Sequence, residues 1–387
     1  MGVESDASDW RVFRRRILES ARRVVIKVGS AVLTGEQGLD LRRMHRLADQ
    51  LAGIMDRGVS VVLVSSGAVA AGRRVITTSG HGGCLAGKQA LSAVGQSRLM
   101  HVYDEIFANY GKITAQILLT KDDLKSRTRF LNARNTFSQL LSWGVLPIVN
   151  ENDTVAVQEL KFGDNDTLAA LILNVVEAQL FVNLTSAEGV FDDNPLENPE
   201  AKILSCIERI GDLNLARICR GKTTEGSGGM YSKLLAAKRA AQIGVPTLVL
   251  SGKMPFGLEK AFAGEDVGTW VMPEGKAISR KKFWMAYNQD TAGEVVVDQG
   301  AVAALTGRGK SLLPAGIVDI RGRFGVGALV RILGPDDEPL AVGLTNYTSN
   351  DLRRIMGRNT SEIKDILGQI SYPEAIHRDN MLLDAAF

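Results

Sequence analysis

The sequence predicts an α/β protein: a mostly parallel sheet sandwiched by helices, followed by a smaller β-rich domain. Up to about residue 275, short β-branched runs alternate with longer helical patterns. Continuous apolar runs separated by helices are typical of parallel strands that are covered on both faces. Beyond that point, short strand-like segments are broken by glycines, which is typical of a small β domain.

Six apolar runs are expected to form the buried strands of the sheet. In chain order they are VVIKV (24–28), VSVVLV (59–64), ITAQILL (113–119), VLPIV (145–149), LFVNL (180–184) and PTLVL (246–250). Glycine or small polar residues follow several of them, as in KVGSA, VSSGA, VNEND, NLTSAEG and VLSGK. Ligands of open α/β sheets bind beyond the carboxyl ends of the strands, so we expect the functional site there.

The flanking segments suggest further parts of the chain. We expect an N-terminal extension (1–22), a first domain (23–275), a linker (276–290), the β-rich domain (291–370) and a C-terminal tail (371–387). The first 23 residues combine an arginine cluster with four acidic residues and no continuous apolar run. That pattern argues against a secretory signal and favours an amphipathic helix. No stretch approaches the length of a membrane span, and we expect a cytoplasmic protein.

Composition narrows the classes of function. A chain of 387 residues is long enough for two or three domains. The formal net charge of +3 is close to balance and gives no strong reason to expect a nucleic-acid partner. Three cysteines stand far apart, namely Cys84, Cys206 and Cys219. Their number and spacing suit a reducing compartment and do not form a metal-ligand pattern.

The stretch RKKFWMAYNQD (280–290) is basic and aromatic. Its first five residues are Arg280, Lys281, Lys282, Phe283 and Trp284. They can be interpreted as a patch that binds nucleic acid, or as a solvated linker whose aromatic side chains pack between the domains. The nearly neutral composition favours the linker.

Two glycine-containing turns follow the first two predicted strands. Lys27 ends the first strand and is followed by Gly29, and SSGAVAAG (65–72) follows the second. Small residues let backbone N–H groups approach an anion, and a following helix N-terminus adds positive charge. Neither turn matches the GxxxxGK[ST] phosphate loop or the GxGxxG dinucleotide motif. Each turn alone is also compatible with a plain strand-to-helix connection.

A third glycine-rich segment is more specific. In TTEGSGGMYSKLLAAKRA (223–240), three glycines precede a helix whose first turn contains Lys233. Backbone amides and an ammonium group could converge there on a phosphate. The alternative is a flexible loop before an ordinary amphipathic helix with a solvated lysine.

Carboxylates are concentrated in VNENDTVAV (149–157) and KFGDNDTLAA (161–170). The second segment is not an EF-hand, because it lacks the glycine and the closing glutamate of that loop. Asp166 precedes TLAALIL and could cap a helix, and Asp153 could be a turn residue. The four histidines have no paired spacing, and no GxSxG motif is present. Lysines, phosphate-binding loops and carboxylates without an obvious base are typical of phosphoryl transfer.

Seven ordered motifs together resemble the bacterial glutamate 5-kinases of the amino acid kinase superfamily. They are VVIKVGSAVLTGE, VVLVSSGAVAAG, KQALSAVGQSRLM, RFLNARNTFSQLL, PIVNENDTVAV, KFGDNDTLAA and GSGGMYSKL. The later segments AGEVVVDQGAVAAL, SLLPAGIVDI and LRRIMG resemble the PUA domain that follows the kinase domain in many members. The resemblance runs in order from about residue 22 to HRDNM (377–381). It implies the amino acid kinase fold.

The resemblance also implies an activity. Such an enzyme uses ATP and Mg²⁺ to phosphorylate the γ-carboxylate of L-glutamate, in the first step of proline biosynthesis. Members are commonly inhibited by proline and form oligomers. A carboxylate with a pKa of about 4.3 is already ionised at neutral pH, which explains why no base is obvious. Lysines and Mg²⁺ would reduce the repulsion between the two anionic substrates.

The resemblance implies residue roles as well. Lys27 and Lys233 match lysines that contact ATP phosphates, and Asp166 matches the aspartate that orients them. The positions that hold glutamate are matched by Ser66, Asn150, Asp153 and Asn165. The nucleotide-binding positions are matched by Lys27, Gly29, Thr185, Ser186, Ser227, Gly228, Gly229, Met230, Tyr231, Ser232 and Lys233. No metal-binding residue is assigned.

One departure from the family pattern is visible. Many relatives have Thr-Asp after the strand at 180–184, whereas this chain has Thr185 and Ser186. A specific nucleotide contact at Ser186 is therefore in doubt. The alternatives are a kinase for aspartate, acetylglutamate, carbamate or a nucleoside monophosphate, which should differ at SSGA, NEND and FGDND. PUA domains commonly bind RNA, so weak RNA binding is a further alternative that can coexist with kinase activity.

Overall fold

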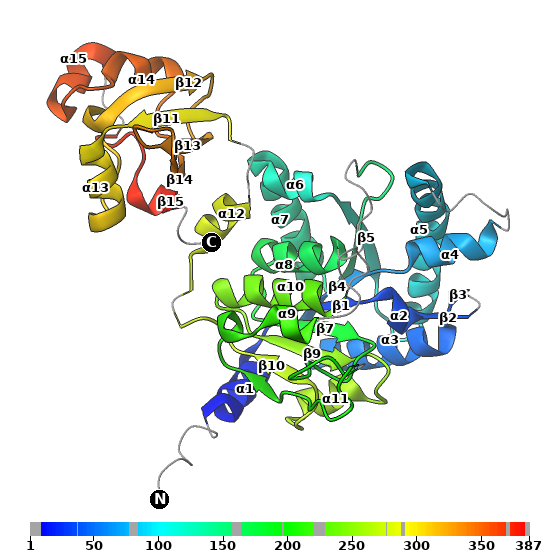
Figure 1. Cartoon of the computed structure of the whole chain (residues 1–387). Helices are drawn as coiled ribbons and strands as arrows, with labels where there is room; N and C mark the ends of the chain where they lie inside the picture. Colours follow the sequence, from blue (N-terminus) through cyan, green and yellow to red (C-terminus); the bar gives the residue numbers. More distant parts are fainter. Residues whose placement is uncertain are drawn as a thin grey trace, which may run out of the picture. The chain divides into compact units, whose positions relative to one another are not determined.

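The chain divides into two units, Met1–Ala277 and Ile278–Phe387 (Figure 1). The computed structural model describes residues 9–36, 38–76, 84–156, 164–195, 197–219, 229–275, 277–287, 291–368 and 372–383. The first unit is built on an eight-stranded sheet with the order β5-β6-β4-β1-β7-β9-β10-β8. β10 runs antiparallel to β9, and the other pairings in this sheet are parallel.

The strands of the first unit include the six that the sequence predicted. They are β1 (Arg23–Val28), β2 (Thr34–Gly35), β3 (Gly38–Leu39), β4 (Ser60–Ser65), β5 (Thr114–Leu119), β6 (Leu146–Glu151), β7 (Leu180–Thr185), β8 (Cys206–Ile207), β9 (Thr247–Ser251) and β10 (Thr269–Val271). β2 and β3 form a separate short ribbon. The predicted positions are confirmed, but the prediction that all six are buried is wrong for β5. That strand has a neighbour on one side only, and its residues alternate between half-buried and exposed.

The helices of the first unit alternate with these strands, as the sequence predicted. They are α1 (Asp9–Ser20), α2 (Ser30–Leu33), α3 (Leu41–Asp56), α4 (Ala68–Val75), α5 (Leu85–Ala108), α6 (Lys121–Lys125), α7 (Arg127–Ser142), α8 (Asp164–Val175), α9 (Leu215–Ile218), α10 (Met230–Gln242) and α11 (Gly257–Phe262), with a 3₁₀ turn, η1, at Ile210–Asp212. The amphipathic helix expected near the N-terminus is confirmed as α1. Its residue Trp10 is buried in the core of this unit.

The alternation of side chains along β1 decides which way Lys27 points. Val24, Ile26 and Val28 belong to the core cluster that contains the buried residues of α3 and α5. Successive side chains of a strand point to opposite faces, so Lys27 points to the other face. On that face α8 and α10 pack against each other (Figure 1).

The order of the strands places α8 over the centre of the sheet. β6 precedes α8 in the chain and β7 follows it, but β4 and β1 lie between these two strands in the sheet. α8 therefore crosses β4 and β1, both of which it contacts. Its first turn lies beyond the carboxyl ends of the strands, where open α/β sheets bind their ligands.

The second unit has a five-stranded sheet with the order β12-β11-β13-β14-β15. Its strands are β11 (Gly293–Val297), β12 (Ile317–Gly322), β13 (Leu329–Leu333), β14 (Pro339–Leu344) and β15 (Met381–Leu383). Its helices are α12 (Arg280–Tyr287), α13 (Gln299–Arg308), α14 (Ser349–Ile355) and α15 (Ile363–Leu367), with 3₁₀ turns η2 (Pro314–Gly316), η3 (Thr360–Glu362) and η4 (Arg378–Asn380). A core of its own, which includes Val295, Ile332 and Ile376, holds this unit together.

Two segments of the second unit differ from the expectation. The basic and aromatic stretch forms α12, which contacts β14 and β15. Its Trp284 and Met285 pack with apolar side chains of the second unit's own sheet, so 280–287 is a packed helix and not solvated chain. The segment 372–383, expected as a tail, contributes β15 to the sheet. Neither segment has a long apolar run, so sequence pattern alone did not reveal them.

Candidate active site

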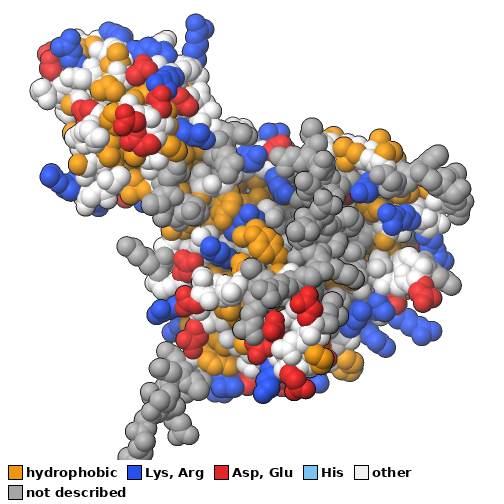
Figure 2. Space-filling model, in the orientation of Figure 1, with side chains coloured by type: hydrophobic (Ala, Val, Ile, Leu, Met, Phe, Trp, Pro, Cys, Tyr) orange, Lys and Arg blue, Asp and Glu red, His pale blue; other side chains and the backbone are white. Residues whose placement is uncertain are grey.

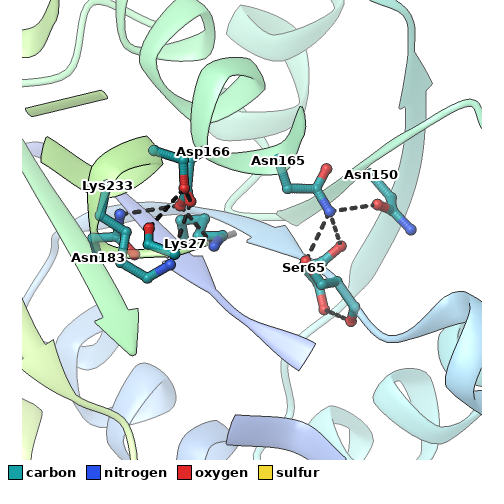
Figure 3. Close-up of polar contacts among 10 residues, drawn as sticks. Lys27, Ser65, Asn150, Asn165, Asp166, Asn183 and Lys233 are labelled. Carbon is teal, nitrogen blue, oxygen red and sulfur yellow. Dashed lines mark hydrogen bonds and ion pairs between the residues drawn. The ribbon is translucent and has the colours of Figure 1, made fainter. Parts of the chain in front are cut away.

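A buried carboxylate with two lysines forms the centre of the site (Figure 3). Lys27 Nζ lies 2.6 Å from Asp166 Oδ1, and Lys233 Nζ lies 3.4 Å from Asp166 Oδ2. The side chain of Asp166 is fully buried, and those of the two lysines are 5% and 7% exposed. Three elements thus bring one negative and two positive charges together: β1, α8 and α10.

Two neutral side chains complete the surroundings of Asp166. Ser232 Oγ donates to Oδ2 at 2.7 Å, and Asn183 Nδ2 donates to Oδ1 at 3.1 Å. Asn183 is the residue of β7 that lies opposite Lys27 of β1 in the sheet register. All four partners of Asp166 are side chains. The interpretation of Asp166 as a helix cap is therefore wrong, because α8 begins two residues earlier and the carboxylate binds lysines instead.

The charges shift the ionisation of this group. Burial alone would raise the pKa of Asp166, but Lys27, Lys233 and the hydrogen bond from Ser232 outweigh it and hold the pKa below its ordinary value. Burial lowers the pKa of Lys233, and the charge of Lys27 adds to this, although Asp166 offsets part of the effect. One carboxylate faces two ammonium groups here, so the group carries a net positive charge that suits an anionic ligand.

Asn165, the neighbour of Asp166, points to a second group of polar side chains (Figure 3). Its Nδ2 donates at 2.9 Å both to Ser66 Oγ and to Asn150 Oδ1. The backbone N–H of Glu151 donates to Asn150 Oδ1 at 2.9 Å. The ends of β4 and β6 thereby meet the first turn of α8, and three of the residues expected to hold an amino acid lie together.

Asp153, the fourth of these residues, is tied to α5. Ser92 Oγ donates to its Oδ2 at 2.5 Å. Gln96, one helical turn after Ser92, accepts from Asn150 Nδ2 through its Oε1 at 2.8 Å. α5 thus contacts both parts of the expected amino acid site.

The structure describes most of the residues that are expected to bind the nucleotide. Gly229 is the N-cap of α10 and has no side chain that could cap the helix, and the first-turn N–H groups of a helix have no partner within it. A Cβ on Gly29 would lie 3.8 Å from Lys27 Nζ. Thr185 is buried at the end of β7, whereas Ser186 and Tyr231 are exposed. Met230 begins α10, and Ser227 and Gly228 lie outside the described residues.

Sequence reasoning missed Asn183 and Gln96, and it also missed Ser92, which contacts Asp153. Asn183 stands in the run LFVNL, which was interpreted only as a buried strand, and Gln96 stands in KQALSAVGQSRLM, of which no residue was assigned. Both side chains are at least nine-tenths buried. A buried amide needs hydrogen-bond partners, so an asparagine in the middle of an apolar strand was a usable signal. For Gln96 the pattern of the helix carried no such signal.

The matches to protein families agree with this arrangement. The model of the amino acid kinase family matches residues 22–251, and the model of the PUA domain matches residues 293–367. The first unit thus belongs to the amino acid kinase family, and the second contains a PUA domain.

Individual relatives narrow the class. Glutamate 5-kinase of Oleidesulfovibrio alaskensis is 62% identical over 377 residues, which cover 97% of this chain and 99% of that protein. Glutamate 5-kinase of Maridesulfovibrio salexigens is 60% identical, over 96% of this chain and 99% of the relative. Glutamate 5-kinase of Geobacter sulfurreducens is 47% identical, over 96% of this chain and 100% of the relative. Within the amino acid kinases, the chain belongs to the glutamate 5-kinase family.

Proposed function

We propose that this protein transfers the γ-phosphoryl group of ATP to the γ-carboxylate of L-glutamate, the first step of proline biosynthesis. One observation carries the proposal. The consecutive residues Asn165 and Asp166 join a group of amides and hydroxyls to a buried pair of lysines. An amino acid and a nucleotide phosphate bound to these two groups would meet at the start of α8.

The reaction needs no protein base. An oxygen of the γ-carboxylate attacks the γ-phosphorus, and the bond from that phosphorus to the β,γ-bridging oxygen breaks. ADP leaves with the electron pair, and L-glutamyl 5-phosphate is formed. A carboxylate with a pKa near 4.3 is already ionised, so the enzyme has to overcome repulsion and align the two anions.

The residues around Asp166 supply this electrostatic help. Lys27 and Lys233 donate to the phosphate oxygens, where negative charge spreads in the transition state, and Asp166 keeps both ammonium groups in place. The carboxylate of Asp153 pairs with the α-ammonium group of glutamate. Ser66, Asn150 and Asn165 surround the α-carboxylate.

The nucleotide binds beside the lysines. The N-terminus of α10 offers backbone amides to a phosphate, and Gly29 and Thr185 lie at the ends of the two neighbouring strands. Bound together with ATP, Mg²⁺ would supply further positive charge beside the phosphates. Within the described ranges no group of three or more His, Cys, Asp or Glu residues could hold a metal ion.

A hydroxamate assay tests the activity. L-glutamate, ATP, Mg²⁺ and hydroxylamine should give the hydroxamate of the acyl phosphate product. Aspartate, acetylglutamate and carbamate serve as competing acceptors. If one of them is phosphorylated and L-glutamate is not, the proposed substrate is wrong.

Lysine variants test the assignment of the site. Lys27→Ala and Lys233→Ala should each lower kcat by roughly 10²–10³-fold or more, because each removes a preorganised donor to the transition state. Lys238→Ala, an exposed lysine on the same helix as Lys233, is the matched control and should keep its kcat. A kcat near that of the wild type in either site variant would remove that lysine from the mechanism.

Further properties of the family extend the proposal. We propose inhibition by proline, a homo-oligomer and a cytoplasmic location. In the part of the chain that the structure describes, no helix is long and apolar enough to cross a membrane. For the PUA domain we propose weak binding of RNA. The face of this domain seen in Figure 2 carries lysine, arginine, aspartate and glutamate side chains intermixed, which favours weak over tight binding. Salt-dependent retention on RNA measures it.

A further inference from the structure

The side-chain amides of Gln96, Asn150 and Asn165 form a row of hydrogen bonds from α5 to the start of α8. One backbone donor decides which way the amide of Asn150 faces. The N–H of Glu151 can only donate, and it points at Asn150 Oδ1 at 2.9 Å. The oxygen of the Asn150 amide must therefore face Glu151 and Asn165, and its Nδ2 must face Gln96. Amide oxygen and nitrogen are otherwise interchangeable in shape, so this donor decides the assignment.

Gln96 is the first amide of this row, on α5. Its Oε1 accepts from Asn150 Nδ2 at 2.8 Å, whereas its buried Nε2 has no hydrogen-bond partner among the described residues. Turning the Gln96 amide over would set an NH₂ group against the NH₂ group of Asn150. The structure thus retains an unsatisfied buried donor in order to present an acceptor to Asn150, and buried polar groups of this kind call for an explanation.

The contacts of Asn150 show what this acceptor achieves. If Asn150 turned over, its Nδ2 would face the Glu151 N–H and the Asn165 Nδ2, both of which are donors. Asn165 Nδ2 would then lose one of its acceptors and would be held, among the described residues, by Ser66 Oγ and the carbonyl oxygen of Ser65 alone. An acceptor at Gln96 thus stabilises the orientation of Asn150 and, through it, one of the hydrogen bonds that orient Asn165, beside the bond from the Glu151 N–H to Asn165 Oδ1 (Figure 3).

We propose that Gln96 is a positioning residue for the amino acid substrate, which acts by fixing the orientation of the Asn150 and Asn165 amides. This inference rests on the proposed function for the identity of that substrate. Gln96 lies on the side of Asn150 away from Asn165 and Asp166, so it should influence the binding of glutamate and leave the lysine group unaffected.

Gln96→Met, which has a similar length and lacks the acceptor, tests the proposal. The KM for L-glutamate should rise about tenfold, close to the effect of one hydrogen bond. The KM for ATP should stay within about twofold of the wild-type value, and kcat should change less. Gln50→Met is the matched control: Gln50 is buried on α3, and its amide is paired with backbone groups at Arg46 and Leu258. An equal rise in both KM values would overturn the proposal, as would an unchanged KM for glutamate.

A double-mutant cycle tests whether Gln96 acts through Asn150. In Asn150→Ala the acceptor on Gln96 has nothing to orient, so adding Gln96→Met should not raise the KM for glutamate further. Additive effects of the two substitutions would contradict the proposal. Thermal unfolding and ATP binding show that each variant is folded. The wild-type enzyme is assayed in parallel, because failure to phosphorylate glutamate there concerns the proposed function and not the role of Gln96.

Discussion

Asp166 is the residue on which the lysine group depends. Asp166→Asn would leave the buried ammonium groups of Lys27 and Lys233 without their carboxylate. Removing one member of a buried ion pair costs about 3–5 kcal/mol, so the free energy of unfolding should fall by about that amount. Turnover should fall as well, because the lysines repel each other out of position. Denaturant unfolding and the hydroxamate assay measure the two effects.

The pH dependence of the free energy of unfolding tests whether the charge of Asp166 causes this loss of stability. The pKa of Asp166 is lowered in the folded protein relative to its ordinary value of 3.8. Its stabilising contribution is therefore complete above pH 3.8 and is lost as the pH falls through the lower, folded value. Below about pH 4 the wild type should lose stability more steeply than Asp166→Asn. Parallel curves for wild type and Asp166→Asn would contradict this assignment.

The sequence predicted the site residues that stand in recognisable motifs. It did not predict those that reach the site only through the packing of strands and helices. Asp166 lies 139 residues after Lys27 in the sequence, and Lys233 lies 67 residues after Asp166, yet each stands in a recognisable motif. Their common contact follows from the crossing of α8 over β1. Asn183 joins them through the strand register, and no local pattern encodes the register between β1 and β7.

Among the elements, α4 and α5 cross in close contact beside the proposed amino acid site. A Cβ on Gly95 of α5 would lie 1.7 Å from the carbonyl oxygen of Ala68 on α4. Gly95→Ala should therefore push the helices apart, at a cost of about 1–3 kcal/mol in stability. Because Ser66 precedes α4 and Gln96 is on α5, the KM for glutamate should rise, with a smaller change for ATP.

A second glycine provides the control for this prediction. Gly53 lies inside α3, and an added Cβ there has no atom within 4 Å. Gly53→Ala should leave the KM values unchanged and stabilise the protein by up to about 1 kcal/mol, because alanine favours the helix. Steady-state kinetics and thermal unfolding of both variants measure these effects on KM and on stability. An unchanged KM for glutamate in Gly95→Ala would show that the close crossing of α4 and α5 does not affect substrate binding.

Some helices and strands could not be predicted from sequence patterns. The six predicted strands carry long β-branched runs, and all six form. α12 and β15 carry short mixed runs, and they are stable because they pack on a sheet built from distant residues. Whether β5 is a central or an edge strand depends on the order of the strands in the sheet, which a continuous apolar run does not specify.

For the whole molecule, the two units have separate cores and should respond separately to damage. Ile332 is fully buried in the core of the second unit, which contains residues of that unit alone. Ile332→Ala should cost the second unit about 2–5 kcal/mol and leave kcat for glutamate unchanged. Leu63→Ala, in the core of the first unit, should lower both the stability of that unit and turnover. Calorimetry should show only the transition of the second unit shifted to lower temperature in Ile332→Ala, and only that of the first unit in Leu63→Ala. A parallel loss of turnover in Ile332→Ala would mean that the kinase depends on the PUA domain for its own stability.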